Sequence, residues 1–465
     1  MNKKKIIGFI IGCFFMFGFS YLGIPTNLSV DAMIMIGIFL GAITMWLTVD
    51  VDWPSLLVLF SLTQLTDVSI ATVMANSLGN NTIAFLIFSC ILTYALSSTG
   101  LLRRIALWFI SLDIAKKSPW LFALMYFISI LVIGSFISPT VLFVLYFALA
   151  KEIYFLNGLT PGDNYAKMLM IGTAIMTSIS CAMTPIAHTF PLMAIGYYEA
   201  ATGLTINWLK YMAIGIPAGL VSAGLTFGAL YLGFRNKIND YKNLSSDFEL
   251  NKISKEEIIS LVVFLIVVAM WLVSGLFPNW LPILKTWTTT IPPIFGIAVL
   301  CLFGILNFNE AIKNGVPWTS IILCGATLAV GKWLTADSLG ITAAIGEFMS
   351  SIITTTSPFV MILIIAAFTI IMTNLMSNIV TTTVSYNLLT PIILTTGIIS
   401  PVLSTVLIGM CASMAYATPP AIAHVALAAG SGYCDSKDML KYGGIATIGS
   451  IICVLIFAFF MRGIF

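Results

Sequence analysis

The stretch TNLMSNI at residues 373–379 breaks an apolar run that is otherwise long enough to cross a membrane. Lipid cannot satisfy backbone groups freed from a helix, so a polar break of this kind should face a protected cavity. A second break, ISPT at 137–140, places Ser138 239 residues before Ser377. Pro139 lacks a backbone amide and biases Ser138 away from the helical region, so a helix should end there. The chain is therefore expected to contain two copies of one unit.

The only two histidines of the chain repeat at nearly the same interval. His188 ends the motif TPIAH and His424 ends the motif TPPAIAH, 236 residues later. Each follows a Thr-Pro pair, which should interrupt a helix at Thr184 or Thr418. In membrane proteins, internal repeats with broken helices are typical of secondary transporters whose binding site lies between the repeats.

Composition indicates a polytopic membrane protein. Hydrophobic residues make up 59% of the 465 residues and charged residues 8%, whereas soluble domains contain roughly 25% charged residues. The mean hydropathy is +1.05. The net charge of +3 gives no reason to expect a nucleic-acid partner. Apolar runs that suit spans or half-spans cover residues 5–25, 30–48, 119–137, 165–182, 209–233, 258–276, 291–308, 357–376, 392–412 and 443–462. They lack the alternation of a β-barrel, so we expect an all-α protein.

A polar stretch at 235–257, with five basic and five acidic residues, lies at the midpoint of the chain. It predicts five segments: N-terminal scaffold spans at 1–80, a first repeat at 81–235, a cytoplasmic linker at 236–257, further scaffold spans at 258–316 and a second repeat at 317–465. Within each repeat we expect a re-entrant hairpin (81–110 and 318–349), a helix broken at the serine motif, a Thr-Pro break and a closing span. Three lysines at 3–5 place the N-terminus in the cytoplasm by the positive-inside rule.

A new helix should begin directly after each serine break. The free amides and positive dipole end of a helix N-terminus favour an anion, so two such ends suit a ligand with two carboxylates. Serine and threonine in membrane helices often bond back to the preceding turn without any further role. Two matched breaks, each followed by a Thr-Pro break, favour a binding site over that alternative.

Several segments resemble the divalent anion/sodium symporter (INDY-type) family. NLMSNI at 374–379 is similar to the second Ser-Asn-Thr signature of that family. ATPP at 417–420, GSGY at 430–433 and KDM at 437–439 are similar to its closing region, and STGLLRR at 98–104 resembles its first hairpin.

The resemblance implies two inverted repeats with re-entrant hairpins and about eleven spans, in a homodimer that works by an elevator motion. It implies transport of C4–C6 di- and tricarboxylates across the plasma (inner) membrane, and no enzymatic activity. The residues expected to bind substrate are Ser138, Pro139, Thr140, Thr184, Ser377, Asn378, Ile379, Thr418 and Pro419. A sodium site is expected at Thr373, Asn378 and Ala417.

The chain departs from the family pattern where sodium should bind. Pro139 stands where the family has asparagine, Ile379 where it has threonine, and Gly134 where it has serine. Since proline supplies no side-chain oxygen, we expect the first sodium site to be altered. His188 and His424 are expected to donate hydrogen bonds to the substrate or to replace a cation. The alternative is that both are packed, neutral histidines.

Lys332 is a further candidate, for charge compensation. A lysine within a membrane segment is costly and usually functional, although it could instead extend to the interface beside Trp333.

The sequence thus favours a sodium-independent exchanger of dicarboxylates such as succinate, malate or 2-oxoglutarate. It needs no cofactor, with sodium ion as the possible exception. The alternative is a sodium-coupled symporter that uses the second ion site. An intramembrane protease is disfavoured because the chain has no Gly-x-Ser-x-Gly or His-Glu-x-x-His motif. A channel would not need two equivalent pairs of broken helices.

Overall fold

The computed structural model describes residues 3–22, 28–238, 252–277, 280, 290–341, 343–344, 357–419 and 421–465. Within these ranges the regular secondary structure is helical, without a β-strand. Ten of the described helices are long and apolar enough to cross a membrane, or up to eleven if one bent pair is counted as a single span. The prediction of an all-α polytopic membrane protein is confirmed.

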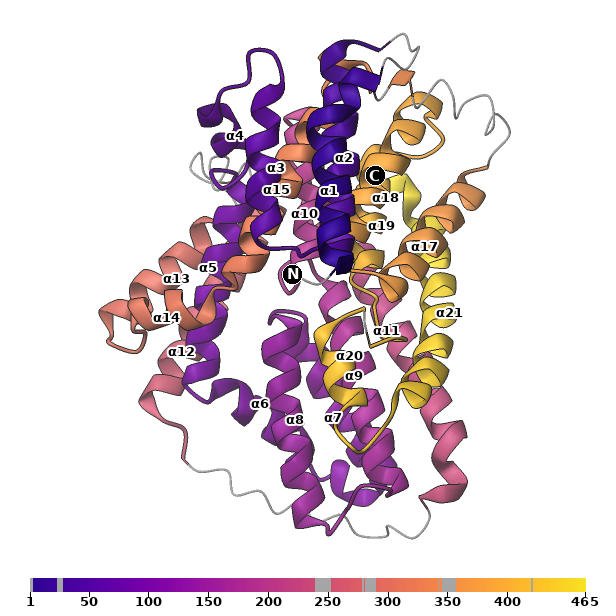
Figure 1. Ribbon diagram of the computed structural model, residues 1–465. Coiled ribbons are helices and arrows are strands. Elements are labelled where there is room, and N and C mark those ends of the chain that lie inside the picture. Colours follow the sequence, from indigo (N-terminus) through magenta and orange to yellow (C-terminus); the bar gives the residue numbers. More distant parts are fainter. Residues whose placement is uncertain are drawn as a thin grey trace.

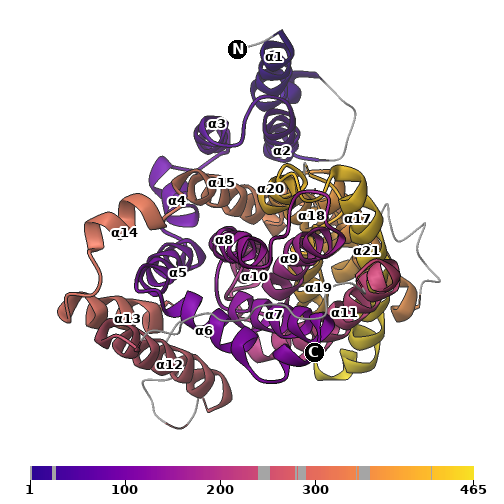
Figure 2. The same ribbon diagram turned by 90° about the horizontal axis from the view of Figure 1, so that it is seen from below.

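The first half of the chain starts with a small N-terminal group of helices that pack on one another: α1 (Lys3–Gly18), α2 (Val30–Thr48), α3 (Trp53–Ser61) and α4 (Ile70–Asn76). Figure 2 shows α1, α2 and α3 at one edge of the molecule. The rest of this half consists of α5 (Asn81–Ser98), α6 (Leu101–Ser111), α7 (Pro119–Gly134), α8 (Pro139–Leu156), α9 (Asn164–Met183), α10 (Thr189–Thr202) and α11 (Trp208–Phe234).

The second half contains α12 (Lys255–Leu276), α13 (Ile291–Leu302), α14 (Phe308–Gly315), α15 (Trp318–Leu334), α17 (Pro358–Leu375), α18 (Asn378–Thr396), α19 (Pro401–Ala412), α20 (Ala423–Ala429) and α21 (Ser436–Met461). Most of the expected linker at 236–257 lies outside the described residues, although α12 begins within it.

The two halves have opposite orientations. In Figure 1, α7, α8 and α9 occupy the lower part of the molecule, whereas α17, α18 and α19 occupy the upper part. The broken pair α9–α10 passes from the lower part to the upper, and α19–α20 passes from the upper part to the lower. The closing helices α11 and α21 pack along each other. This is the inverted-repeat arrangement that the sequence predicted.

The helices on either side of Ser138 form a hairpin. The Tyr126 hydroxyl of α7 donates to the carbonyl of Tyr146 in α8 at 3.1 Å, and the Tyr146 hydroxyl donates to Ser129 Oγ at 2.6 Å. A continuous helix would separate residues 126 and 146 by about 30 Å. The contacts therefore require α7 and α8 to run antiparallel, with the serine motif at the tip between them.

This hairpin lies elsewhere than we expected. We predicted the first hairpin at 81–110 and a helix broken at Ser138, but α5 alone has 18 residues and is long enough to cross a membrane. The arms of the observed hairpin have 16 and 18 residues. Length therefore could not distinguish a half-span from a span. Of the second hairpin expected at 318–349, α15 is described and is bent by 69° from α14, but most residues beyond 341 lie outside the described part.

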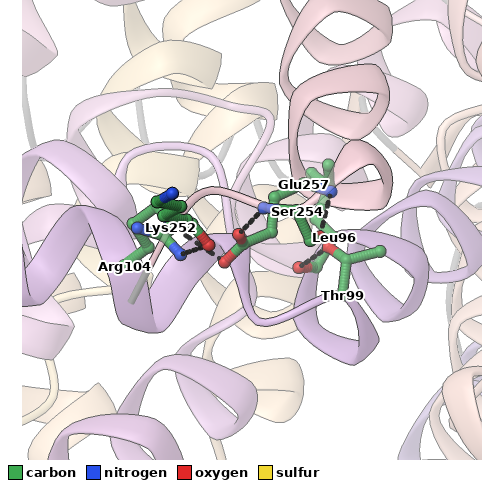
Figure 3. Close-up of polar contacts among 6 residues, drawn as sticks. All are labelled: Leu96, Thr99, Arg104, Lys252, Ser254 and Glu257. Carbon is green, nitrogen blue, oxygen red and sulfur yellow. Dashed lines mark hydrogen bonds and ion pairs between the residues drawn. The ribbon is translucent and has the colours of Figure 1, made fainter. Parts of the chain in front are cut away.

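Helix α6 is tied to the second half of the chain by a partly buried ion pair (Figure 3). Arg104 Nε donates to Glu257 Oε1 at 2.9 Å, and Arg104 Nη2 donates to the carbonyl of Lys252 at 3.2 Å. The other carboxylate oxygen of Glu257 accepts from the Ser254 amide at 2.8 Å, within the capping box that starts α12. The Arg104 and Glu257 side chains are 21% and 9% exposed.

The neighbouring arginine makes a more exposed pair within the first half. Arg103 Nη2 donates to both carboxylate oxygens of Glu152, at 2.9 and 2.7 Å, and links α6 to α8. These side chains are 49% and 40% exposed. Solvent screening makes such pairs weak, so the two adjacent arginines should differ in their contribution to stability.

We predict that Arg104→Ala lowers the free energy of unfolding by about 2 kcal/mol, because it removes a charged partner from a nearly buried carboxylate. Arg103→Ala is the matched control and should cost less than about 1 kcal/mol. Thermal unfolding of the purified protein in detergent measures both. Equal losses of stability in Arg104→Ala and Arg103→Ala would contradict the prediction that the Arg104–Glu257 pair contributes more.

Candidate functional site

In each half, a threonine hydroxyl joins the Thr-Pro break to the serine break. Thr184 Oγ1 donates to the carbonyl of Ser135, and Thr418 Oγ1 donates to the carbonyl of Asn374. Both acceptors lie three residues before the motif serine of their half: Ser135 before Ser138, and Asn374 before Ser377. The same hydrogen bond thus occurs in both repeats. In each repeat it joins the serine break to the Thr-Pro break, and the sequence predicted that these breaks form one site.

The motif serines begin the second arms of their hairpins. Ser138 is the N-cap residue of α8 and Ser377 that of α18, and neither side chain makes a capping hydrogen bond. Both hydroxyls and the adjacent helix N-termini are therefore available to a ligand. Pro139 is buried at the first position of α8, where its missing amide is tolerated. The first turn of α8 thus offers one amide fewer than that of α18.

The third motif positions, Thr140 and Ile379, have different surroundings in the two halves, and their role in binding substrate stays a prediction. Thr140 is exposed on α8. Ile379 packs against both hydrophobic clusters of the protein. Its side chain makes apolar contacts where the family pattern has a hydroxyl. Pro419, beside Thr418, is half-buried in the second Thr-Pro break.

Asn374 organises the second break, a role that the sequence did not assign to it. Its Nδ2 donates to the carbonyls of Ile370 and Met414 at 2.8 and 3.0 Å. Its Oδ1 accepts from the amides of Tyr416 and Ala417 at 2.9 and 2.7 Å. One buried side chain thereby satisfies three backbone groups of the unwound segment that follows α19. An asparagine inside an otherwise apolar run was the available signal.

The first break is held by fewer side-chain bonds. Ser135 occupies the position that corresponds to Asn374 at the interval of 239 residues, and its hydroxyl donates to Leu131 of its own helix at 2.8 Å. Its backbone carbonyl accepts from Thr184, and its hydroxyl also contacts Met183 Sδ at 3.9 Å, directly before that break. The two breaks are therefore related but unequal.

The residues expected to hold sodium surround the second break. Thr373 Oγ1 donates to the carbonyl of Ala412 at 2.7 Å, and the amide of Ala417 is bound by Asn374. Asn378 is 3% exposed, and within the described part of the chain neither atom of its side-chain amide has a hydrogen-bond partner. Neutral oxygen groups of this kind fit a hard cation such as sodium.

His424 bridges the two repeats. Its Nε2 lies 2.7 Å from Ser178 Oγ in α9, and the same hydroxyl donates to the carbonyl of Ala415 at 2.6 Å. A hydroxyl carries a single proton, so Ser178 accepts from His424 and the proton of the imidazole is on Nε2. The ring also lies 5.8 Å from that of Phe143 in α8.

His188 has different surroundings. It is the residue before α10, and its ring packs edge-on against Phe190 at 4.2 Å. Its buried Nδ1 has no hydrogen-bond partner in the described part of the chain. The two histidines are thus matched in sequence, but only His424 has a side-chain partner here.

Lys332 lies in the last turn of α15 and is half-buried. This helix packs against α10 and α18, which carry parts of both breaks. No carboxylate of the described residues forms an ion pair with Lys332. Its role in charge compensation stays a prediction.

Comparison with known proteins adds independent information. The sequence model of a family described as the sodium:sulfate symporter transmembrane region matches residues 3–463. Two relatives described as sodium-dependent dicarboxylate transporter SdcS, from Staphylococcus saprophyticus and Staphylococcus aureus, are each 26% identical to the chain, over 99% of this chain and 92% of their own. The crystal structure of the YdaH transporter from Alcanivorax borkumensis shares the fold, with a TM-score of 0.57, 15% identity, and coverage of 89% of this chain and 91% of that one.

The assigned proton on His424 can be tested by substitution. Glutamine places an N–H near the position of Nε2, so His424→Gln should keep the bond to Ser178, whereas His424→Leu should lose about 1–2 kcal/mol of stability. Thermal unfolding of both variants gives the comparison. The assignment is wrong if glutamine and leucine destabilise the protein equally.

Proposed function

Because the chain belongs to the sodium:sulfate symporter family of membrane transport proteins, we propose that it is a sodium-coupled secondary transporter of C4–C6 dicarboxylates. The observation that carries the proposal is the pair of uncapped motif serines, Ser138 and Ser377, each at the start of a helix from an oppositely oriented repeat. Two helix N-termini with free hydroxyls suit a ligand with two carboxylates. Relatives named sodium-dependent dicarboxylate transporters support this substrate class.

This proposal replaces the sodium-independent exchange that the sequence favoured. That expectation rested on the loss of an oxygen ligand at Pro139 and on histidines that would replace a cation. The relatives favour the sodium-coupled alternative. The contacts of His424 support the same revision, because its proton is donated to Ser178 rather than kept for a substrate. Asn378 retains a buried amide without a partner in the described part of the chain, where an ion would find a ligand.

We assign distinct roles to the site residues. Ser138, Ser377 and the first amides of α18 bind the substrate carboxylates, whereas Thr184 and Thr418 hold the breaks in place through their bonded protons. Sodium at Thr373, Asn378 and Ala417 offsets the charge of a buried dianion, whose transfer from water would otherwise be very costly. A sodium ion bound beside the N-terminus of α18 thereby raises the affinity for the anion, and the bound anion raises the affinity for sodium.

The remaining expectations concern the assembly. We propose that the protein lies in the plasma (inner) membrane with a cytoplasmic N-terminus, as the lysines at 3–5 suggest. We also propose that it forms a homodimer and transports by an elevator motion, in which the paired hairpin tips carry the substrate across the bilayer.

Coupling to sodium is tested by uptake of labelled succinate into proteoliposomes. An inward sodium gradient should drive accumulation into vesicles that contain no dicarboxylate, and replacing sodium with choline should abolish it. Uptake that requires succinate inside the vesicles and does not depend on sodium would instead support the sodium-independent exchanger.

The binding role of Ser377 is tested against a serine with a structural role. Ser377→Ala should raise the KM for succinate at least about tenfold, which corresponds to the loss of roughly 1.4 kcal/mol of binding, with little change in stability. Ser400 caps α19, its Oγ accepting from the Val402 amide at 3.2 Å. Ser400→Ala should therefore cost about 1 kcal/mol of stability and leave KM unchanged. An unchanged KM in Ser377→Ala would remove it from the site.

A further inference from the structure

Buried polar atoms without partners are concentrated in the second hairpin. Twelve buried side-chain polar atoms of the described residues lack a hydrogen-bond partner, and seven of them belong to residues 369–390 of α17 and α18. Such an atom costs about 1–3 kcal/mol unless something satisfies it, and native proteins leave few unsatisfied. This concentration indicates that the hairpin binds something polar.

Three of these residues form a row along α18. Asn378, Thr381 and Ser385 are spaced by three and four residues, so they lie on one face of the helix over two turns. The side chains of Thr381 and Ser385 are fully buried. The neighbouring Thr382 is equally buried, but its hydroxyl donates to the carbonyl of Asn378 at 2.8 Å. The row thus consists of the positions that do not bond back to the helix.

The row lies on a different side of α18 from Val380 and Val384. Val380 and Val384, on another side of α18, pack in the cluster formed with α15 and the N-terminal helices. The remaining neighbours of α18 include α17 and α19, which also pack on each other. The row therefore lies away from α15, and α17, the other arm of the hairpin, is among the helices that contact α18.

Thr369 carries a further buried hydroxyl on α17, the other arm of the hairpin. It is fully buried, has no partner in the described part of the chain, and precedes Thr373 by one turn, so both lie on one face. Thr373 bonds to Ala412 at the end of α19, so that face of α17 is turned toward α19 and away from lipid. Counted from the break between α17 and α18, Thr369 and Ser385 lie at similar depths in the two arms.

The first hairpin lacks an equivalent row. At the repeat interval of 239 residues, Thr369, Thr381 and Ser385 correspond to Ile130, Leu142 and Tyr146. Ile130 and Leu142 are apolar, and the Tyr146 hydroxyl is bonded to Ser129. The polar row is therefore a property of the second hairpin and not of hairpins in general.

We propose that Thr369, Thr381 and Ser385 hold a further sodium ion, deeper in the second hairpin than the ion at Asn378. The proposal rests on the sodium coupling proposed above. The donors are neutral oxygens, and the described residues contain no cluster of three or more His, Cys, Asp and Glu side chains that would hold a metal ion; this chemistry suits a monovalent hard cation better than a transition metal.

The charge of the substrate explains why a second ion in this hairpin is useful. A dicarboxylate needs two monovalent cations for neutrality, and Pro139 removes an oxygen ligand from the tip of the first hairpin. An ion within the second hairpin restores the balance without the first site. Asn378, whose buried amide stands at the start of the row beside the tip, is shared by the two positions.

The test compares adjacent threonines. Thr381→Val and Ser385→Ala should raise the sodium concentration for half-maximal succinate uptake at least about tenfold and lower the Hill coefficient for sodium by about one. Thr382→Val is the matched control, since its hydroxyl is already bonded, and should change the half-maximal concentration less than about twofold. Thr381→Ser should restore the wild-type curve.

A binding measurement separates this proposal from sodium coupling itself. Sodium chloride, compared with choline chloride and without substrate, should raise the melting temperature of the wild type and of Thr382→Val, and raise it less in Thr381→Val. If Thr381→Val responds to sodium like Thr382→Val in this assay and in transport, the row binds water and the proposal is overturned. Sodium-independent uptake by the wild type would refute sodium coupling. The sodium-induced change in melting temperature would still show whether the row binds sodium.

Discussion

The structure depends on one constraint, which is that every backbone group freed at a helix break within the membrane needs a partner from the protein. Thr184 and Thr418 meet this need in the two halves with the same bond, and Asn374 adds a bridge to the unwound segment after α19. The backbone at the breaks is thereby held by the protein itself. In the function that we propose, the helix N-termini that follow the serine motifs then keep their amides for the anion.

The sequence predicted the features that depend on composition and local interruption. Proline and polar residues stand out in apolar runs. They therefore allowed us to predict the all-α class, the repeats and the positions of the breaks at Ser138, Thr184, Ser377 and Thr418. The sequence did not predict that the chain reverses direction at Ser138, because hairpin arms and full spans overlap in length. The contact between Ser178 and His424 also escaped prediction, because it joins residues 246 apart that only the assembled repeats bring together.

The two hairpins have diverged in complementary ways. The first has a proline at its tip and apolar or bonded residues along its arms, whereas the second has Asn374, Asn378 and a row of hydroxyls. Similar helices therefore carry unequal polar content. In the function that we propose, this asymmetry places the sodium ions mainly in the second repeat, while both repeats contribute a helix N-terminus to the anion.

The shared threonine bond also bears on the origin of the protein. It connects equivalent positions in two oppositely oriented units, which is the pattern that duplication of a single unit leaves. The bond is thus a feature of the repeated unit and not of either half alone.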